Sequence, residues 1–97
     1  MSRLFGRKKR ASRVFTIKNR YGIHARPAAL FVKAMSVFDS EISVVKGGNR
    51  VSGKSIMGLL SIEASRNAQI KVTATGPDAI EALDAVQALI DSKFDED

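Results

Sequence analysis

The sequence of 97 residues contains no cysteine, and His24 is its only histidine. Without cysteine the chain can form no disulfide and offers no thiolate to a metal ion, and one imidazole cannot make a zinc site by itself. We therefore expect no metal site. Long apolar runs are also missing, and the basic start of the chain is not followed by a secretory apolar segment. We expect a cytoplasmic protein without membrane contact.

Acidic residues are fewer than basic ones, 10 against 16, which gives a net charge of +6. The excess is concentrated near the N-terminus, where six cations have no acid among them: Arg3, Arg7, Lys8, Lys9, Arg10 and Arg13. We interpret residues 1–12 as a basic, flexible arm and residues 13–97 as one nearly neutral domain, since this length supports a single core. The alternative is a nucleic-acid-binding module that uses the arm, although Phe5 is the arm's only aromatic residue.

The hydrophobic periodicity predicts seven elements. Alternation indicates strands at residues 14–18, 41–45, 49–52 and 69–75, the middle two joined as a hairpin through Gly47 and Gly48. Helical spacing predicts helices at residues 25–37, 56–62 and 80–90, and Asp78 with Glu81 resembles a capping box for the last. The order β-α-β-β-α-β-α predicts an α+β fold, a four-stranded antiparallel sheet with three helices on one face.

The segment Gly22–Pro27 places the imidazole of His24 at or beside the start of the first predicted helix. Backbone N–H groups and the positive end of the helix dipole meet there, so a phosphate on the ring would be stabilised. Neutral histidine is a good nucleophile near pH 7, and Arg26 can contact phosphate oxygens. The pattern therefore suggests a phosphoryl carrier. The alternative is that His24 only caps a helix or lies on the surface.

Two motifs together resemble the histidine-containing phosphocarrier family, HPr, of the bacterial phosphotransferase system. The first is Gly22-Ile23-His24-Ala25-Arg26-Pro27-Ala28-Ala29-Leu30-Phe31-Val32, and the second is Gly53-Lys54-Ser55-Ile56-Met57-Gly58-Leu59. The resemblance covers residues 14–97 and implies an open-faced β-sandwich, a monomer and no cofactor. It also implies a carrier and not a catalyst. His24 would accept a phosphoryl group on its pros nitrogen from enzyme I, assisted by Arg26, and pass it to sugar-specific IIA-type acceptor proteins.

The short helix after Ser55 carries more apolar residues than the core requires. Ile56, Met57 and Leu60 are therefore candidates for a docking surface, in line with the resemblance, although helical spacing alone is equally compatible with burial of all three. Some relatives carry a basic residue where this chain has Gly58. The resemblance also suggests that an HPr kinase/phosphorylase could phosphorylate Ser55, whose simpler role is to cap the helix.

Residues 48–55 match the nucleotide-binding pattern G-x-x-x-x-G-K-[ST]. We reject nucleotide binding because residues 49–52 are predicted to be a hairpin strand, whereas such a loop must connect a buried parallel strand to a long helix.

Two parts of the sequence point to different branches of the HPr family. The segment around Ser55 resembles the sugar-transport branch, which we favour, whereas the ending at residues 94–97 resembles the nitrogen-related branch with a regulatory output.

Overall fold

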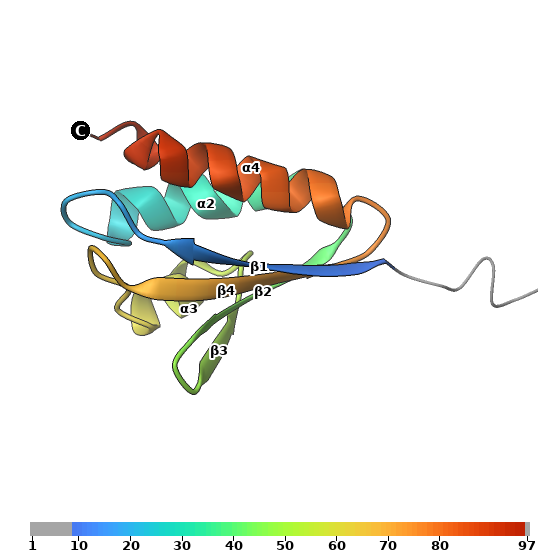
Figure 1. The fold of residues 1–97 in the computed structure, drawn as a ribbon, viewed down its shortest axis with the longest axis horizontal. Helices are drawn as coiled ribbons and strands as arrows, with labels where there is room; N and C mark the ends of the chain where they lie inside the picture. The colour runs from blue at the N-terminus through green and yellow to red at the C-terminus, as the bar shows by residue number, and fades with distance from the viewer. Residues whose placement is uncertain (1–8, 97) are drawn as a thin grey trace, which may run out of the picture.

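The structure, a computed structural model, describes residues 9–96. Four strands, three α-helices and one 3-10 turn follow one another along the chain (Figure 1). They are β1 (Arg10–Thr16), α2 (Ala25–Ser36), β2 (Glu41–Lys46), β3 (Asn49–Ser52), α3 (Ile56–Ser61), β4 (Gln69–Thr75), α4 (Ala79–Asp91) and η1 (Lys93–Asp95). The predicted element order is confirmed, and the strands at residues 49–52 and 69–75 have the predicted bounds.

The four strands form one sheet in the order β1-β4-β2-β3, with every neighbouring pair antiparallel. The first strand begins at Arg10, four residues earlier than predicted. Residues 10–12 were assigned to the basic arm because of their charge, but Arg10, Ala11 and Ser12 pair with β4 opposite Thr75, Ala74 and Thr73. Main-chain pairing tolerates basic side chains on the exposed face of an edge strand. The rest of the predicted arm, residues 1–8, lies outside the described residues.

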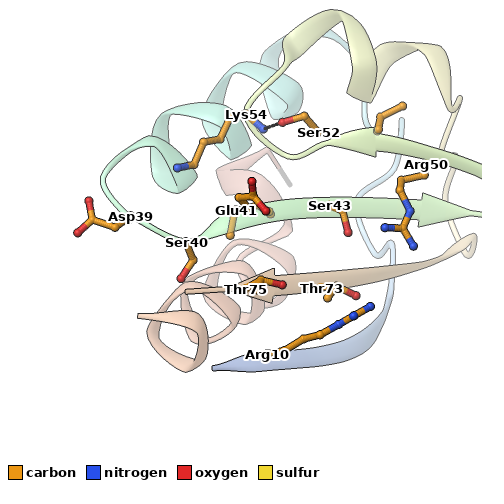
Figure 2. A pocket seen from close by; sticks show the side chains of 12 residues that line it. Arg10, Asp39, Ser40, Glu41, Ser43, Arg50, Ser52, Lys54, Thr73 and Thr75 are labelled. Carbon is orange, nitrogen blue, oxygen red and sulfur yellow. Dashed lines mark hydrogen bonds between the residues drawn. The ribbon is translucent and has the colours of Figure 1, made fainter. Parts of the chain in front are cut away.

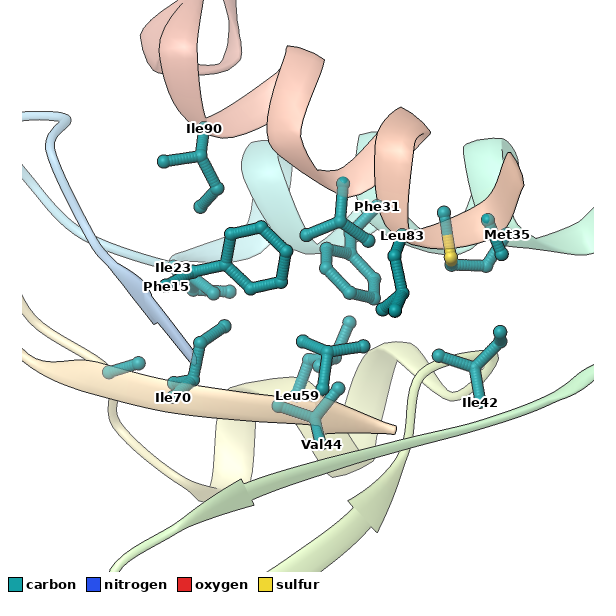
Figure 3. Packing of buried hydrophobic residues seen from close by; sticks show 14 of the residues in the cluster. Phe15, Ile23, Phe31, Met35, Ile42, Val44, Leu59, Ile70, Leu83 and Ile90 are labelled. Atoms are coloured by element: carbon teal, nitrogen blue, oxygen red, sulfur yellow. The ribbon is translucent and has the colours of Figure 1, made fainter. Parts of the chain in front are cut away.

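Helices α2 and α4 lie over one face of the sheet (Figure 1), and α3 packs against α2 and buries Leu59 in the same core, which confirms the predicted α+β architecture. Between the two layers lies a core of aliphatic and aromatic side chains (Figure 3). Phe31 of α2, Leu59 of α3 and Leu83 of α4 are fully buried there against Val44 and Ile70 of the sheet. Burial of this apolar surface fixes α2, and therefore the start of α2, relative to the sheet.

The predicted capping box at the start of α4 is wrong. Asp78 is the N-cap residue of α4, but its side chain makes no capping hydrogen bond. Its carboxylate instead accepts hydrogen bonds from the backbone N–H groups of Asp39 and Ser40, each at 2.9 Å, and from Ser40 Oγ at 2.6 Å. These bonds, that from the Ser40 hydroxyl above all, hold the pKa of Asp78 below its ordinary value of 3.8. Asp78 therefore ties the α2–β2 loop to α4.

Helical spacing places Ile80 on the apolar face of the helix predicted at residues 80–90, and the structure differs at this position. Ile80 is exposed, while the neighbouring Ala79 and Ala82 are fully buried. Small side chains let α4 lie close to the sheet, so alanine replaces isoleucine on the buried face.

Candidate functional site

The loop that carries His24 is held against the segment before β4 by backbone contacts. Gly22 has a φ of 68°, which only glycine adopts without strain, and a side chain there would overlap the carbonyl of Ala64. The next residue, Ile23, is buried and donates its N–H to the same Ala64 oxygen at 2.8 Å. This close approach at Gly22 fixes the backbone that carries His24.

His24 is the N-cap residue of α2, as its position in the sequence predicted. Its backbone is extended, and its carbonyl accepts the first helical bond from Ala28 N–H at 2.9 Å. The imidazole makes no capping bond, and 43% of the side chain is exposed. No acidic residue of α2 lies in its first turn, so within the helix itself nothing offsets the positive end of the dipole. The ring is accessible beside an anion-favouring helix terminus.

The imidazole has one direct partner, the carboxylate of Glu96 near the C-terminus. His24 Nε2 lies 2.8 Å from Glu96 Oε2, although the two residues are 72 positions apart. Asn19 is fully buried, and its Nδ2 donates to Glu96 Oε1 at 2.8 Å and to the carbonyl of Gly22 at 2.7 Å. Only 12% of the Glu96 side chain is exposed. The ring, the carboxylate and the loop before the helix therefore form one hydrogen-bonded unit.

A left-handed turn brings Glu96 to the histidine. Lys93, Phe94 and Asp95 have φ values of 54°, 53° and 56°, a conformation that costs a residue with a side chain about 1–2 kcal/mol. Phe94 is fully buried in the core, and burial of a phenylalanine, about 1.5–3 kcal/mol, offsets part of the strain of the three residues. The aromatic ring therefore anchors the chain end where the Glu96 carboxylate meets His24.

Tyr21 packs against the His24 imidazole, and two arginines lie nearby in the sequence. The rings of Tyr21 and His24 pack edge to face at 6.3 Å between centroids, and Arg20 lies 5.7 Å from the centre of the Tyr21 ring. Arg26 is exposed on the first turn of α2, and no ion pair within residues 9–96 involves it. Its guanidinium is therefore available to an incoming anion.

Sequence reasoning missed three neighbours of His24: Asn19, Tyr21 and Glu96. Asn19 and Tyr21 were assigned to an ordinary turn, and the acidic chain end was treated only as a resemblance to one branch of a family. No local pattern connects residues 72 positions apart. A single apolar residue, Phe94, among charged ones after the last helix was the available signal that the chain end returns to the core.

The second motif forms the short helix α3 and its cap. Ser55 is the N-cap, and its Oγ accepts a hydrogen bond from the backbone N–H of Gly58 at 3.0 Å. On α3, Ile56 and Met57 are 41% and 75% exposed, and Leu60 is half-buried. The reading in which all three are core residues is therefore wrong for Ile56 and Met57. A side chain at Gly58 would press against Val51 and Ser55, and that proximity accounts locally for glycine.

A groove of about 680 Å³ lies on the open face of the sheet, away from the helices (Figure 2). Its walls are polar side chains of all four strands, among them Arg10, Ser43, Arg50 and Thr73. Arg50, Val51 and Ser52 line it from strand β3, and because residues 49–52 are a strand they form no phosphate loop. Within residues 9–96, no three side chains of metal-binding type cluster, and no helix is long and apolar enough to span a membrane.

The sequence of this chain matches one family of known proteins. The family described as "PTS HPr component phosphorylation site" matches residues 11–92. "Phosphocarrier protein HPr" of Treponema pallidum is 44% identical over 81 residues, which are 84% of this chain and 92% of the relative. "Phosphocarrier protein NPr" of Shewanella violacea is 44% identical over 84 residues, 87% of this chain and 92% of the relative.

A solved structure matches this chain both in fold and in sequence. The crystal structure of HPr-C-His from Thermoanaerobacter tengcongensis superposes with a TM-score of 0.86 at 46% identity, covering 90% of this chain and 98% of that one. The chain belongs to the HPr family of phosphocarrier proteins of the phosphotransferase system.

Proposed function

We propose that this protein carries a phosphoryl group on His24, received from phosphorylated enzyme I and delivered to IIA-type acceptor proteins. The observation that carries the proposal is the half-exposed imidazole at the N-terminus of α2, whose first turn contains no acidic residue. A nucleophile used in succession by two protein partners must be reachable from outside, and the positive helix end stabilises phosphate there. Arg26, exposed in the first turn of the helix, supplies a guanidinium for the phosphate oxygens.

The direct test incubates the purified protein with enzyme I and labelled phosphoenolpyruvate. We expect acid-labile label on the parent and none on His24→Ala, because phosphohistidine is the acid-sensitive product. Arg26→Ala should be labelled about tenfold more slowly, since a charge-assisted contact contributes about 1.5–3 kcal/mol when fully formed and less at the surface. Arg50→Ala, which changes the same charge on β3, is the matched control. Equal labelling of the parent and His24→Ala would contradict the proposal.

The docking surface in this proposal is formed by Ile56, Met57 and Leu60 on α3. Exposed apolar side chains on a rigid helix are typical anchors of a protein interface. We expect Met57→Asp to slow phosphoryl transfer from enzyme I while the unfolding transition stays close to that of the parent. Ile80→Asp is the control, because Ile80 is exposed on α4, outside the proposed surface. Equal rates for the two variants would remove α3 from the interface.

Ser55 and the acceptor branch belong to the same proposal. Ser55 is half-buried at the start of α3, beside the exposed Ile56 and Met57, so a phosphate on it would place charge in the docking surface. We infer that an HPr kinase/phosphorylase regulates the carrier through Ser55, and that the acceptors are sugar-specific. Relatives named HPr and NPr match at equal identity, so the choice rests on the Ser55 segment.

Transfer of label from the phosphorylated protein to purified acceptors tests this choice of branch. Faster transfer to a sugar-specific IIA protein supports the sugar branch. Faster transfer to a nitrogen-related acceptor would assign the chain to the other branch.

A further inference from the structure

The contact between His24 and Glu96 determines which nitrogen of the neutral imidazole carries the hydrogen. Glu96 Oε1 already accepts the Asn19 amide, and a carboxylate has no hydrogen to donate, so the 2.8 Å contact requires a hydrogen on His24 Nε2. In neutral histidine only one ring nitrogen carries hydrogen, and the other has the free lone pair. The lone pair of His24 is therefore on Nδ1, the pros nitrogen.

We propose that Glu96 is a positioning residue for phosphoryl transfer, because it fixes the ring orientation and the tautomer in which Nδ1 is the nucleophile. This inference rests on the proposed function of His24. In the step itself, the Nδ1 lone pair attacks phosphorus, and the bond between phosphorus and the donor group breaks, its electron pair leaving with the donor. The Nε2 hydrogen stays in place, so the ring gains positive charge, which the Glu96 carboxylate at Nε2 stabilises.

The surroundings of Glu96 suit this positioning role. The carboxylate is held from both sides, by His24 at one oxygen and by the buried amide of Asn19 at the other. A group that orients a reactive side chain must itself be fixed, and the burial of Phe94 two residues earlier supplies that restraint. Asn19 also binds the carbonyl of Gly22, so the loop before His24 and the chain end are positioned together.

The first test reads the ring itself and needs no partner protein. His24 is the only histidine, so ring nitrogen signals in untagged, nitrogen-15-labelled protein belong to it without ambiguity. We expect the parent at neutral pH to show hydrogen on Nε2 in a slowly exchanging bond. In Glu96→Ala that N–H signal should be lost to exchange, and the fraction of the Nδ1–H form should rise several-fold. Asp95→Ala is the control, because it removes an exposed neighbouring charge without touching the ring.

The second test measures the rate of phosphorylation by enzyme I. We expect Glu96→Ala to be about tenfold slower and Asp95→Ala to stay within about twofold of the parent, a tenfold change being 1.4 kcal/mol. Glu96→Gln keeps the side-chain length without the charge and should fall between them. Ring spectra and rates that are the same in Glu96→Ala as in Asp95→Ala would overturn the inference. A faster Glu96→Ala would overturn it too, because the carboxylate would then obstruct transfer. Failure of the parent to become labelled would instead contradict the proposed function, while the ring spectra would still decide the role of Glu96.

Discussion

At the scale of single residues, the loops at the two ends of α2 are fixed by residues that take part in no reaction. Gly22 is the clearest case, because two separate requirements exclude a side chain: a positive φ and the nearby carbonyl of Ala64. Asp78 is another, because it uses all of its hydrogen bonding to join two loops instead of capping its own helix. Gly22 positions the loop before His24, whereas Asp78 fixes the loop at the opposite end of α2.

We predict that Gly22→Ala destabilises the protein by about 2–4 kcal/mol, because it adds a steric overlap to the cost of a positive φ. Gly47→Ala is the matched control. Gly47 has a similar φ of 59° but open space around it, so only the conformational cost of about 1 kcal/mol remains. Urea unfolding of the two variants measures the difference. Equal losses of stability would show that the Ala64 contact is unimportant.

The hydrogen bonds of Asp78 predict a specific dependence of stability on pH. Its pKa is lower in the folded protein than in the unfolded chain, so the unfolded state binds a proton first as the pH falls. The stabilisation is complete above the ordinary pKa of 3.8 and is lost as the pH falls from there through the lower folded-state pKa. We expect Asp78→Asn to be less stable than the parent at pH 6 and to approach it in that acidic window. Thermal unfolding across pH 2–6 checks this, and a constant difference would contradict it.

At the scale of elements, α3 and the chain end each bury one side chain in the core and direct a nearby one to the surface or to His24. On α3, Leu59 is fully buried in the core while its neighbour Met57 is mostly exposed. In the turn η1, Phe94 is buried while Glu96, two residues later, meets the functional histidine. In each case one apolar side chain anchors a short element, and the neighbouring positions are free to serve a partner or the site.

Truncation of these two anchors should have different consequences at the His24 site. We expect Leu59→Ala to cost about 2–5 kcal/mol and Phe94→Ala about 3–5 kcal/mol in the free energy of unfolding, as is usual for buried side chains. Only Phe94→Ala should also release Glu96 and change the His24 ring spectrum of the folded protein. A Phe94→Ala protein with the spectrum of the parent would show that Glu96 reaches His24 without the aromatic anchor.

At the scale of the whole molecule, residues 9–96 contain the complete sheet and its helical layer. The six basic residues at the start of the chain lie in different places. Arg10 and Arg13 belong to β1, where Arg13 pairs with Asp84 at 2.8 Å, Lys9 directly precedes β1, and Arg3, Arg7 and Lys8 precede the described residues. A test of the nucleic-acid alternative must therefore remove residues 1–8 and not residues 1–12, which include part of the sheet.

We predict that removal of residues 1–8 leaves the melting temperature and the rate of phosphorylation by enzyme I close to those of the full chain. The reason is that β1 pairing begins at Arg10 and the family match at residue 11. Calorimetry and the labelling assay check both quantities. Salt-dependent nucleic-acid binding by the full chain that disappears on this deletion would support the alternative function.

The sequence by itself determined the element order, the bounds of β3 and β4, and the place of His24 at a helix start. These features follow from local periodicity and turn chemistry, which depend on residues close together in the sequence. Only the tertiary structure decided the extension of β1 to Arg10, the partner of Asp78 and the contact of His24 with Glu96. These depend on pairing and burial between segments far apart along the chain. The hydrogen bond between His24 and Glu96 joins two distant segments of the chain, where the core buries Phe94 and the turn after it leads back to the histidine.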